Sequence, residues 1–270
     1  MRSLQQIDQW PVQHAAAAVV TADGVAATRG DVDRVFPLAS VTKLLSAHAV
    51  LVAVQEGVLD LDDVAGPPGA TVRHLLAHAS GLAFDEDRVQ ARPGARRIYS
   101  SAGYAVLGDL VAARSGFAFA DYLAEAVAAP LGLRSTVLAG PAGHGARSTV
   151  TDLVAYAREL LVPTVLANEM HHAATTVAFP GLDGVLPGYG IQRPNDWGLG
   201  PEIRGTKDPH WTGRRNSPRT VGHFGQSGTF CWADPEAGVA LVALTDRDFG
   251  DWCKPLWPAL SDAVLAEITG

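Results

Sequence analysis

The sequence has few cysteines, and it contains no long apolar run. Its 270 residues include only Cys231 and Cys253, so neither a disulfide scaffold nor a Cys-x-x-Cys zinc or redox site is expected. The net charge of −7 argues against a nucleic-acid partner. The longest early apolar run, residues 15–20, falls far short of the ~20 residues that span a bilayer. We therefore expect no membrane partner, and a cytoplasmic location if this start is natural, because no apolar signal region follows the polar opening.

Several common catalytic and cofactor-binding motifs are also missing. No Gly-x-Ser-x-Gly elbow is present, which argues against an α/β-hydrolase, and no Gly-x-Gly-x-x-Gly or P-loop suggests a nucleotide. His74 and His78 are four residues apart on an expected helix, but no Glu follows His74 as a His-Glu-x-x-His zinc site requires. We expect neither a metal nor a cofactor.

The order of expected elements is β at both ends and α in the middle. Asp23-Gly24 joins two apolar runs and predicts a hairpin, while Gly57 ends a helical run that begins near Ser40. Gly- and Pro-rich residues 179–222 predict an irregular segment that frames a cleft. Further expected elements are helices at 72–79, 101–113, 119–128, 151–161 and 256–268, and strands at 228–233 and 238–245.

This order predicts an α+β fold. The simplest assembly pairs the first hairpin with the last strands in a mostly antiparallel sheet, flanked by the terminal helices, with a helical subdomain inserted in the middle of the chain. We place the sheet subdomain at residues 1–38 and 176–270 and the helical subdomain at 39–175. A groove at their junction is the expected binding site.

The first candidate for chemistry is the pair Ser40 and Lys43. Residues i and i+3 of a helix are neighbours on one face, and a helix start stabilises developing negative charge. A lysine held close to Ser40 and partly removed from water has a lowered pKa and can accept the serine proton. The sequence contains only three lysines, so a lysine at this position carries more weight than it would in a lysine-rich chain. The alternative is an N-capping serine beside a surface lysine.

Two further groups of residues could complete such a site. Tyr99 and Ser101 precede an expected helix. Tyr99 could shuttle a proton, and Ser101 could donate a hydrogen bond to Lys43 or to a substrate. The alternative is a packed tyrosine beside a capping serine.

Residues 223–226 open a late strand. Gly225 would let a ligand approach the backbone, and the Gln226 N–H could join that of Ser40 as an oxyanion hole. The alternative there is a histidine at the edge of the sheet beside a glycine bend.

In this order, Ser40-x-x-Lys43, Tyr99-Ser100-Ser101 and His223-Phe224-Gly225 resemble the motifs of the serine β-lactamase and penicillin-binding superfamily, whose class C-like branch also contains esterases. Residues 75–82 resemble the Leu-Leu-x-His-x-Ser-Gly-Leu segment of that branch. The resemblance covers residues 35 to 245 and implies the β-lactamase/transpeptidase-like fold.

The resemblance also implies roles for individual residues. Ser40 would be the acylated nucleophile, Lys43 its activator and Tyr99 the general base or proton relay. The backbone N–H groups of Ser40 and Gln226 would form the oxyanion hole. His223 would take the place of the family's Lys or His, and we expect its titration to give a pH dependence near neutrality.

Two positions depart from the family pattern. Ser101 stands where the family usually has Asn, and Phe224 stands where it usually has Thr. Both changes weaken the recognition of a substrate carboxylate, since Phe224 offers no hydrogen bond and His223 is mostly neutral at pH 7.

We therefore expect a cofactor-free serine hydrolase that acts through an acyl-enzyme on small neutral acyl esters. Alternatives with the same chemistry are a β-lactamase, a D-amino-acid peptidase and an acyltransferase. The alternative of another class is a non-catalytic binding protein on the same scaffold. The expected partner is a small-molecule acyl substrate, and the sequence sets no oligomeric state.

Overall fold

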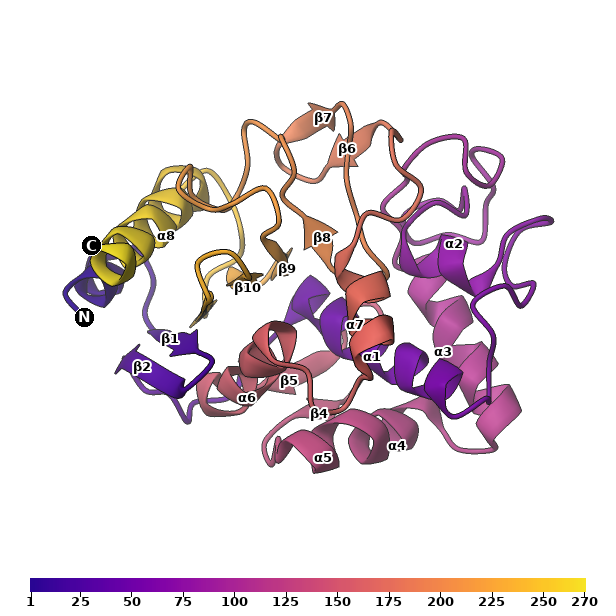
Figure 1. The fold of residues 1–270 in the computed structure, drawn as a ribbon, viewed down its shortest axis with the longest axis horizontal. Helices are drawn as coiled ribbons and strands as arrows, with labels where there is room; N and C mark the ends of the chain where they lie inside the picture. Colours follow the sequence, from indigo (N-terminus) through magenta and orange to yellow (C-terminus); the bar gives the residue numbers. More distant parts are fainter.

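A six-stranded antiparallel sheet forms the frame of the protein, with the strand order β2-β1-β11-β10-β9-β8 (Figure 1). The computed structural model describes residues 1–270. The strands of this sheet are β1 (Ala15–Thr21), β2 (Gly24–Arg29), β8 (Glu202–Ile203), β9 (Val221–Gly225), β10 (Thr229–Asp234) and β11 (Val239–Thr245). β9, β10 and β11 are buried along their whole length, which requires cover on both faces of the sheet.

Two smaller sheets stand beside this frame. One has the order β3-β5-β4, and the other is a hairpin of β6 and β7. Their strands are β3 (Phe36–Pro37), β4 (Val137–Leu138), β5 (Ala146–Ser148), β6 (Gly184–Leu186) and β7 (Gly190–Gln192).

The helices include both long regular ones and short turns. Thr149 caps the helix that follows it, since its side chain accepts a hydrogen bond from the Asp152 N–H. The α-helices are α1 (Thr42–Gln55), α2 (Val72–Leu76), α3 (Ala102–Ser115), α4 (Phe119–Leu123), α5 (Ala129–Leu131), α6 (Val150–Leu161), α7 (Asn168–Thr175) and α8 (Cys253–Thr269). The others are the 3-10 helices η1 (Ser3–Gln9) and η2 (Ala39–Val41) and the π-helical turn η3 (Ala124–Ala128).

Helices cover both faces of the large sheet. Side chains on one face, such as Phe230 and Trp232 of β10, pack with α8 and η1 in one apolar cluster. On the other face, Cys231 and Ala233 join a larger cluster that continues through α1, α3 and α6. The two chain ends lie side by side on the α8 side (Figure 1), where Glu267 accepts hydrogen bonds from the backbone of Arg2 and Ser3.

The expected order of β, α and β, with an antiparallel sheet, is confirmed. Residues 179–222 are less irregular than expected, because they contain the β6–β7 hairpin and β8. The second expected helix ends early, at Leu76, since His78 has a left-handed backbone with φ of 55°. The division into subdomains stays a prediction, and α6 from its helical part packs on β1 and β11.

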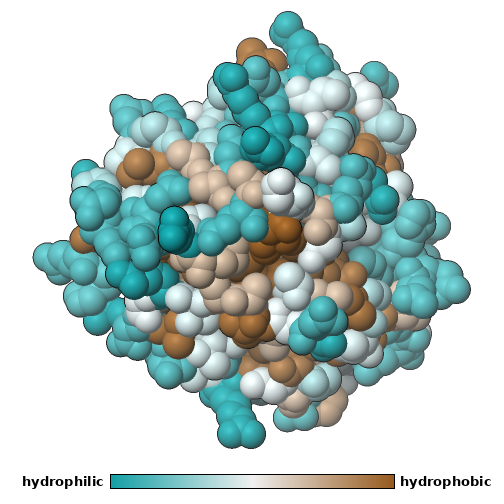
Figure 2. Space-filling view, turned by 60° about the vertical axis from the view of Figure 1, so that its left-hand side comes forward, coloured by the Kyte–Doolittle hydropathy of each residue, from teal (hydrophilic) through white to brown (hydrophobic).

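No helix of the protein is both long and apolar enough to cross a membrane. One face of the molecule has apolar side chains gathered in a hollow with hydrophilic ones around it (Figure 2). A recessed apolar patch of this kind is typical of a binding surface.

Candidate active site

Ser40 lies in the short η2 turn that leads into α1, and its neighbour Ala39 has an unusual backbone. Ala39 has φ of 43°, in the left-handed region that costs a residue with a side chain about 1 kcal/mol or more. The hairpin of β9 and β10 holds this segment, because Ser227 and Thr229 donate hydrogen bonds to the carbonyls of Pro37 (2.7 Å) and Leu38 (3.0 Å). The turn and the second strand of this hairpin therefore hold the segment that leads to Ser40.

Gly225 makes this approach possible. A Cβ atom at Gly225 would lie 2.3 Å from the Leu38 carbonyl oxygen and 2.6 Å from the Thr229 hydroxyl oxygen. The sequence interpretation assigned this space to a ligand, but the chain itself fills it. The glycine brings the following residue, Gln226, to the same cavity wall as Ser40.

Lys43 is fully buried on the first turn of α1, with only neutral groups as hydrogen-bond partners. Its Nζ lies 2.9 Å from Ser101 Oγ, 2.8 Å from the Gly143 carbonyl oxygen and 3.5 Å from Ser40 Oγ. The Tyr99 ring lies below it, with its centroid 4.6 Å from Nζ. Burial lowers the pKa of Lys43 to about 7, because water no longer stabilises the charged form and no carboxylate replaces it.

These contacts determine where the neutral amine would direct its lone pair. A neutral lysine has two N–H donors and one lone pair, and the Gly143 carbonyl can only accept. If the second N–H points at Ser101 Oγ, the lone pair faces Ser40 Oγ, which is the farthest of the three oxygens. The amine is therefore placed to accept the Ser40 proton.

Tyr99 and His223 meet on the other side of the site. His223 Nδ1 must donate to the Phe224 carbonyl oxygen 2.7 Å away, so Nε2 carries the lone pair and accepts from the Tyr99 hydroxyl at 3.3 Å. Burial raises the pKa of Tyr99, and the hydrogen bond with Ser40 opposes this by less. The phenol therefore stays protonated at neutral pH and can pass a proton on, so of the two roles expected for Tyr99 it fits the proton relay and not the general base.

The expected titration of His223 near neutrality is also wrong. Burial, and next the charge of Lys43, lower the pKa of His223 to about 3. The ring is neutral at pH 7, so the group of this site that titrates near neutrality is Lys43.

A cavity of about 260 Å³ opens above these groups. Five of the expected site residues line it, whereas Lys43, Ser101 and Gly225 lie behind its surface. Apolar side chains form much of the rest of the wall, and Trp197 is the one tryptophan among them. The cavity is lined by Ser40, Phe84, Tyr99, Leu186, Pro187, Trp197, His223, Phe224 and Gln226.

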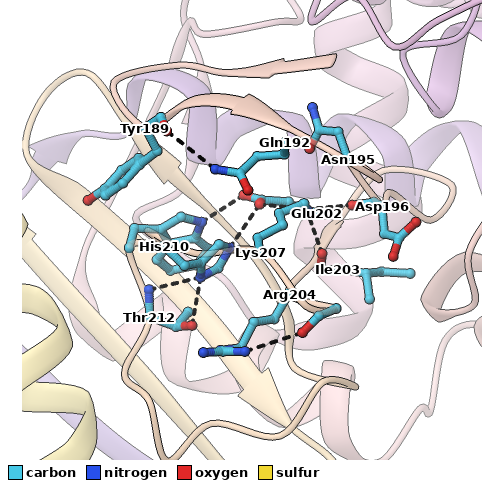
Figure 3. Close-up of polar contacts among 12 residues, drawn as sticks. Tyr189, Gln192, Asn195, Asp196, Glu202, Ile203, Arg204, Lys207, His210 and Thr212 are labelled. Atoms are coloured by element: carbon cyan, nitrogen blue, oxygen red, sulfur yellow. Dashed lines mark hydrogen bonds and ion pairs between the residues drawn. The ribbon is translucent and has the colours of Figure 1, made fainter. Parts of the chain in front are cut away.

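A buried ionic network supports the Trp197 wall (Figure 3). Lys207 Nζ donates to Glu202 at 2.8 Å and to the carbonyls of Asp196 (2.7 Å) and Ile203 (2.6 Å), so it holds the residue next to Trp197. Glu202 also accepts from His210 at 2.9 Å and from the Trp211 indole at 2.7 Å. Burial raises the pKa of Glu202, but the charge of Lys207 and the hydrogen bonds from His210 and Lys207 outweigh it and keep the carboxylate ionised.

Two residues of the site were not among the expected site residues: Gly143, which the sequence analysis did not name, and His78, which it weighed only as a zinc ligand and as part of the 75–82 segment. Gly143 provides a carbonyl to Lys43, and a side chain there would crowd Ser101 at 3.1 Å. The run of glycines at 140, 143 and 145 was the available signal. His78 is fully buried against the Tyr99 ring, with a centroid distance of 4.6 Å, and its Nδ1 accepts from the Ser100 N–H. His74 instead contacts the Thr71 hydroxyl at 2.9 Å.

Comparisons with known proteins identify the family and the fold. The model of the Beta-lactamase family matches residues 11–264. A crystal structure of a beta-lactamase from Mycobacterium bovis is 62% identical, has a TM-score of 0.98, and the match covers 99% of this chain and 100% of that one. Penicillin-binding protein 4* of Bacillus subtilis is 28% identical over a match that covers 37% of this chain. The match spans only 30% of that relative's length.

More distant structures share the fold. Simvastatin synthase from Aspergillus terreus is 18% identical with a TM-score of 0.81, and the match covers 98% of this chain and 93% of that one. EstCE1, a hydrolase with promiscuous acyltransferase activity, has the same identity and TM-score, with 97% and 96% of the two chains covered. The expected β-lactamase/transpeptidase-like fold is confirmed.

Proposed function

The chain belongs to the beta-lactamase family of serine hydrolases, and from this premise we propose that it is an esterase for small neutral acyl esters. The reaction passes through a covalent acyl-enzyme on Ser40. The observation that carries the proposal is the environment of Lys43, a buried amine without a carboxylate partner that lies 3.5 Å from Ser40 Oγ. Such an amine is a base at neutral pH.

In the proposed reaction, the Ser40 oxygen attacks the ester carbonyl carbon while its proton passes to the neutral Lys43 amine. The N–H groups of Ser40 and Gln226 stabilise the oxyanion. When the C–O bond to the alcohol breaks, the leaving oxygen receives the proton from Lys43 by way of the Tyr99 hydroxyl, and the acyl group stays on Ser40. Water then attacks the acyl carbon, gives its proton to Lys43, and the acid leaves as Ser40 regains its proton.

The lining of the Ser40 cavity supports a neutral acyl group. None of the residues that line it carries a positive charge at pH 7, since the pKa of His223 is about 3. Phe84, Leu186, Trp197 and Phe224 offer apolar surface, which stabilises a bound acyl chain by about 25 cal/mol for each Å² it covers. A substrate carboxylate next to the scissile bond would lose water there without gaining a cation.

β-Lactam hydrolysis is the second candidate, and the 62% identical relative described as a beta-lactamase favours it. The two substrates share the acylation step and differ in the carboxylate that a β-lactam carries. The Ser40 cavity offers no cation to a carboxylate beside the scissile bond, and on this ground we rank the ester first.

Matched substrates test the proposal. We expect p-nitrophenyl acetate and butyrate to be hydrolysed and to leave one acyl mass on the protein in rapid-quench mass spectra, while a chromogenic cephalosporin is not turned over. Ser40→Ala should lose both the turnover and the adduct. Ser115→Ala, at the end of α3, should keep both. Turnover of the cephalosporin in preference to the esters would establish the second candidate, and an adduct on Ser40→Ala would refute the nucleophile.

A further inference from the structure

A second cavity adjoins the first, and nothing in the proposed reaction uses it. Its volume is about 310 Å³, and it shares three wall residues with the Ser40 cavity: Phe84, Tyr99 and Pro187. Residues 96–98 form one side of this outer cavity, and Gly184 and Val185 of β6 form another. Tyr99 therefore stands between the reacting serine and the outer cavity.

The apolar side chains that line the outer cavity are exposed to solvent. Phe84 is 52% exposed and Val185 is 56% exposed, which makes both exceptions among the large apolar side chains of this chain. Exposed apolar side chains that gather around one cavity mark a binding surface, because covering them stabilises the complex. A ligand for this cavity needs an apolar body.

Two arginines line the same cavity, and only one of them has a guanidinium group whose N–H donors are available to a ligand. The Arg97 guanidinium is buried and donates to the carbonyls of Ala77, Ala178, Phe179 and Asn195, so its donors are in use. Arg96 is exposed, and its single hydrogen bond is a 3.4 Å contact with the Gln90 carbonyl.

No carboxylate neutralises Arg96. The adjacent loops contain acidic residues, but Glu86 pairs with Arg88 at 2.9 Å and Asp183 with Arg193 at 3.4 Å, and neither Asp85 nor Asp87 forms an ion pair. Arg96 is therefore the cation that this cavity offers to a ligand.

We propose, on the basis of the proposed function, that the outer cavity binds the alcohol half of the ester and that this alcohol carries an anionic group paired with Arg96. The leaving oxygen needs a proton, and Tyr99, which supplies it in the proposed reaction, forms the shared wall. The alcohol therefore leaves past Tyr99 into the outer cavity. The substrate class is an ester of a small neutral acid with an apolar, anionic alcohol.

The test compares two phenyl esters that differ only in charge, 4-(carboxymethyl)phenyl butyrate and 4-(carbamoylmethyl)phenyl butyrate. We expect the ratio of kcat/KM for acid over amide to be about three to five times higher in the wild type than in Arg96→Gln, the upper part of the range for an exposed ion pair. The difference between the wild type and Arg96→Gln should lie in KM and not in kcat, and 0.5 M NaCl should make this difference smaller. Arg92→Gln, an exposed arginine of the same loop outside the cavity lining, should behave as the wild type.

Equal ratios in the wild type and Arg96→Gln would overturn the inference while leaving the esterase intact. A binding experiment separates the two proposals even if no ester is turned over. In the Ser40→Ala background, 4-hydroxyphenylacetate should bind about three to five times more weakly once Arg96→Gln is added, and its amide should bind equally to both. The same affinity for the acid with and without Arg96 would refute the anion site.

Discussion

Two lysines of this protein are buried, and they differ in what surrounds the ammonium group. Lys43 is 0% exposed and has only neutral partners, whereas Lys207 is 3% exposed and contacts the Glu202 carboxylate at 2.8 Å. Burial lowers the pKa of both, but only at Lys207 does the charge of a carboxylate oppose the shift. Burial therefore makes Lys43 a base, whereas Lys207 forms a structural ion pair.

The two lysines lie behind different residues of the cavity wall. Lys43 lies behind Ser40, where a proton must be taken up and released. Lys207 lies behind Trp197, where the wall must stay in place, and its donors are all directed at Glu202 and two carbonyls. A buried ammonium that is paired with a carboxylate keeps its proton and fixes the position of its neighbours. A buried amine without a carboxylate partner can be neutral at pH 7 and accept a proton.

The largest expected effect is on the acylation rate. Lys43→Met removes the base and should slow acylation by p-nitrophenyl acetate by about 10² to 10⁴-fold, the range for a lost general base. Lys207→Met should change the rate per folded molecule by only a few fold. Stopped-flow burst kinetics measure both rates. A similar loss in the two variants would remove the distinction between the lysines.

The next largest effect is on stability, and it is expected at the Lys207–Glu202 pair and not at Lys43. Glu202→Gln leaves the Lys207 charge buried without its partner, so the free energy of unfolding should fall by about 3–5 kcal/mol in urea titrations. Lys43→Met should not lower it, because a methionine there needs no hydration. The double variant Glu202→Gln/Lys207→Met should recover most of the loss. Failure to recover would show that the ion pair is not the cause.

A smaller effect is the pH dependence of stability. The folded-state pKa of Lys43 is about 7 and the unfolded value is 10.5, so between these pH values the unfolded chain binds more protons. Stability therefore rises with pH in this window. From pH 7 to pH 9, the wild type should gain about 2 kcal/mol relative to Lys43→Met. A constant difference between the two proteins across this range would contradict the lowered pKa.

The smallest effect is expected at His223. The pKa of this ring is about 3, so His223→Gln, which keeps an acceptor for the Tyr99 hydroxyl, should leave the midpoint of the pH–rate profile unchanged. We expect the rate itself to change less than about tenfold, as for one hydrogen bond. A midpoint that moves with this substitution would restore His223 as the group that titrates near neutrality.

Much of this site follows from local sequence, and the rest depends on burial. The i, i+3 spacing placed Lys43 beside Ser40, and the order of motifs indicated Tyr99 and the late strand. The Gly143 carbonyl was missed because it contacts Lys43 across 100 residues of chain. The wrong expectation for His223 has the same origin, since no local pattern tells that both faces of β9 are covered.

The most direct test of the account is the titration of the lysine side chains by NMR. The chain contains only three lysines, so ¹⁵N-lysine labelling gives three Nζ signals, with Lys43→Met assigning one and the exposed Lys254 serving as reference. We expect the Lys43 signal to change from ammonium to amine with a midpoint near pH 7, and Lys207 to titrate at higher pH because the Glu202 carboxylate stabilises its ammonium. An ammonium signal for Lys43 that persists to pH 9, or a Lys207 that deprotonates first, would contradict it.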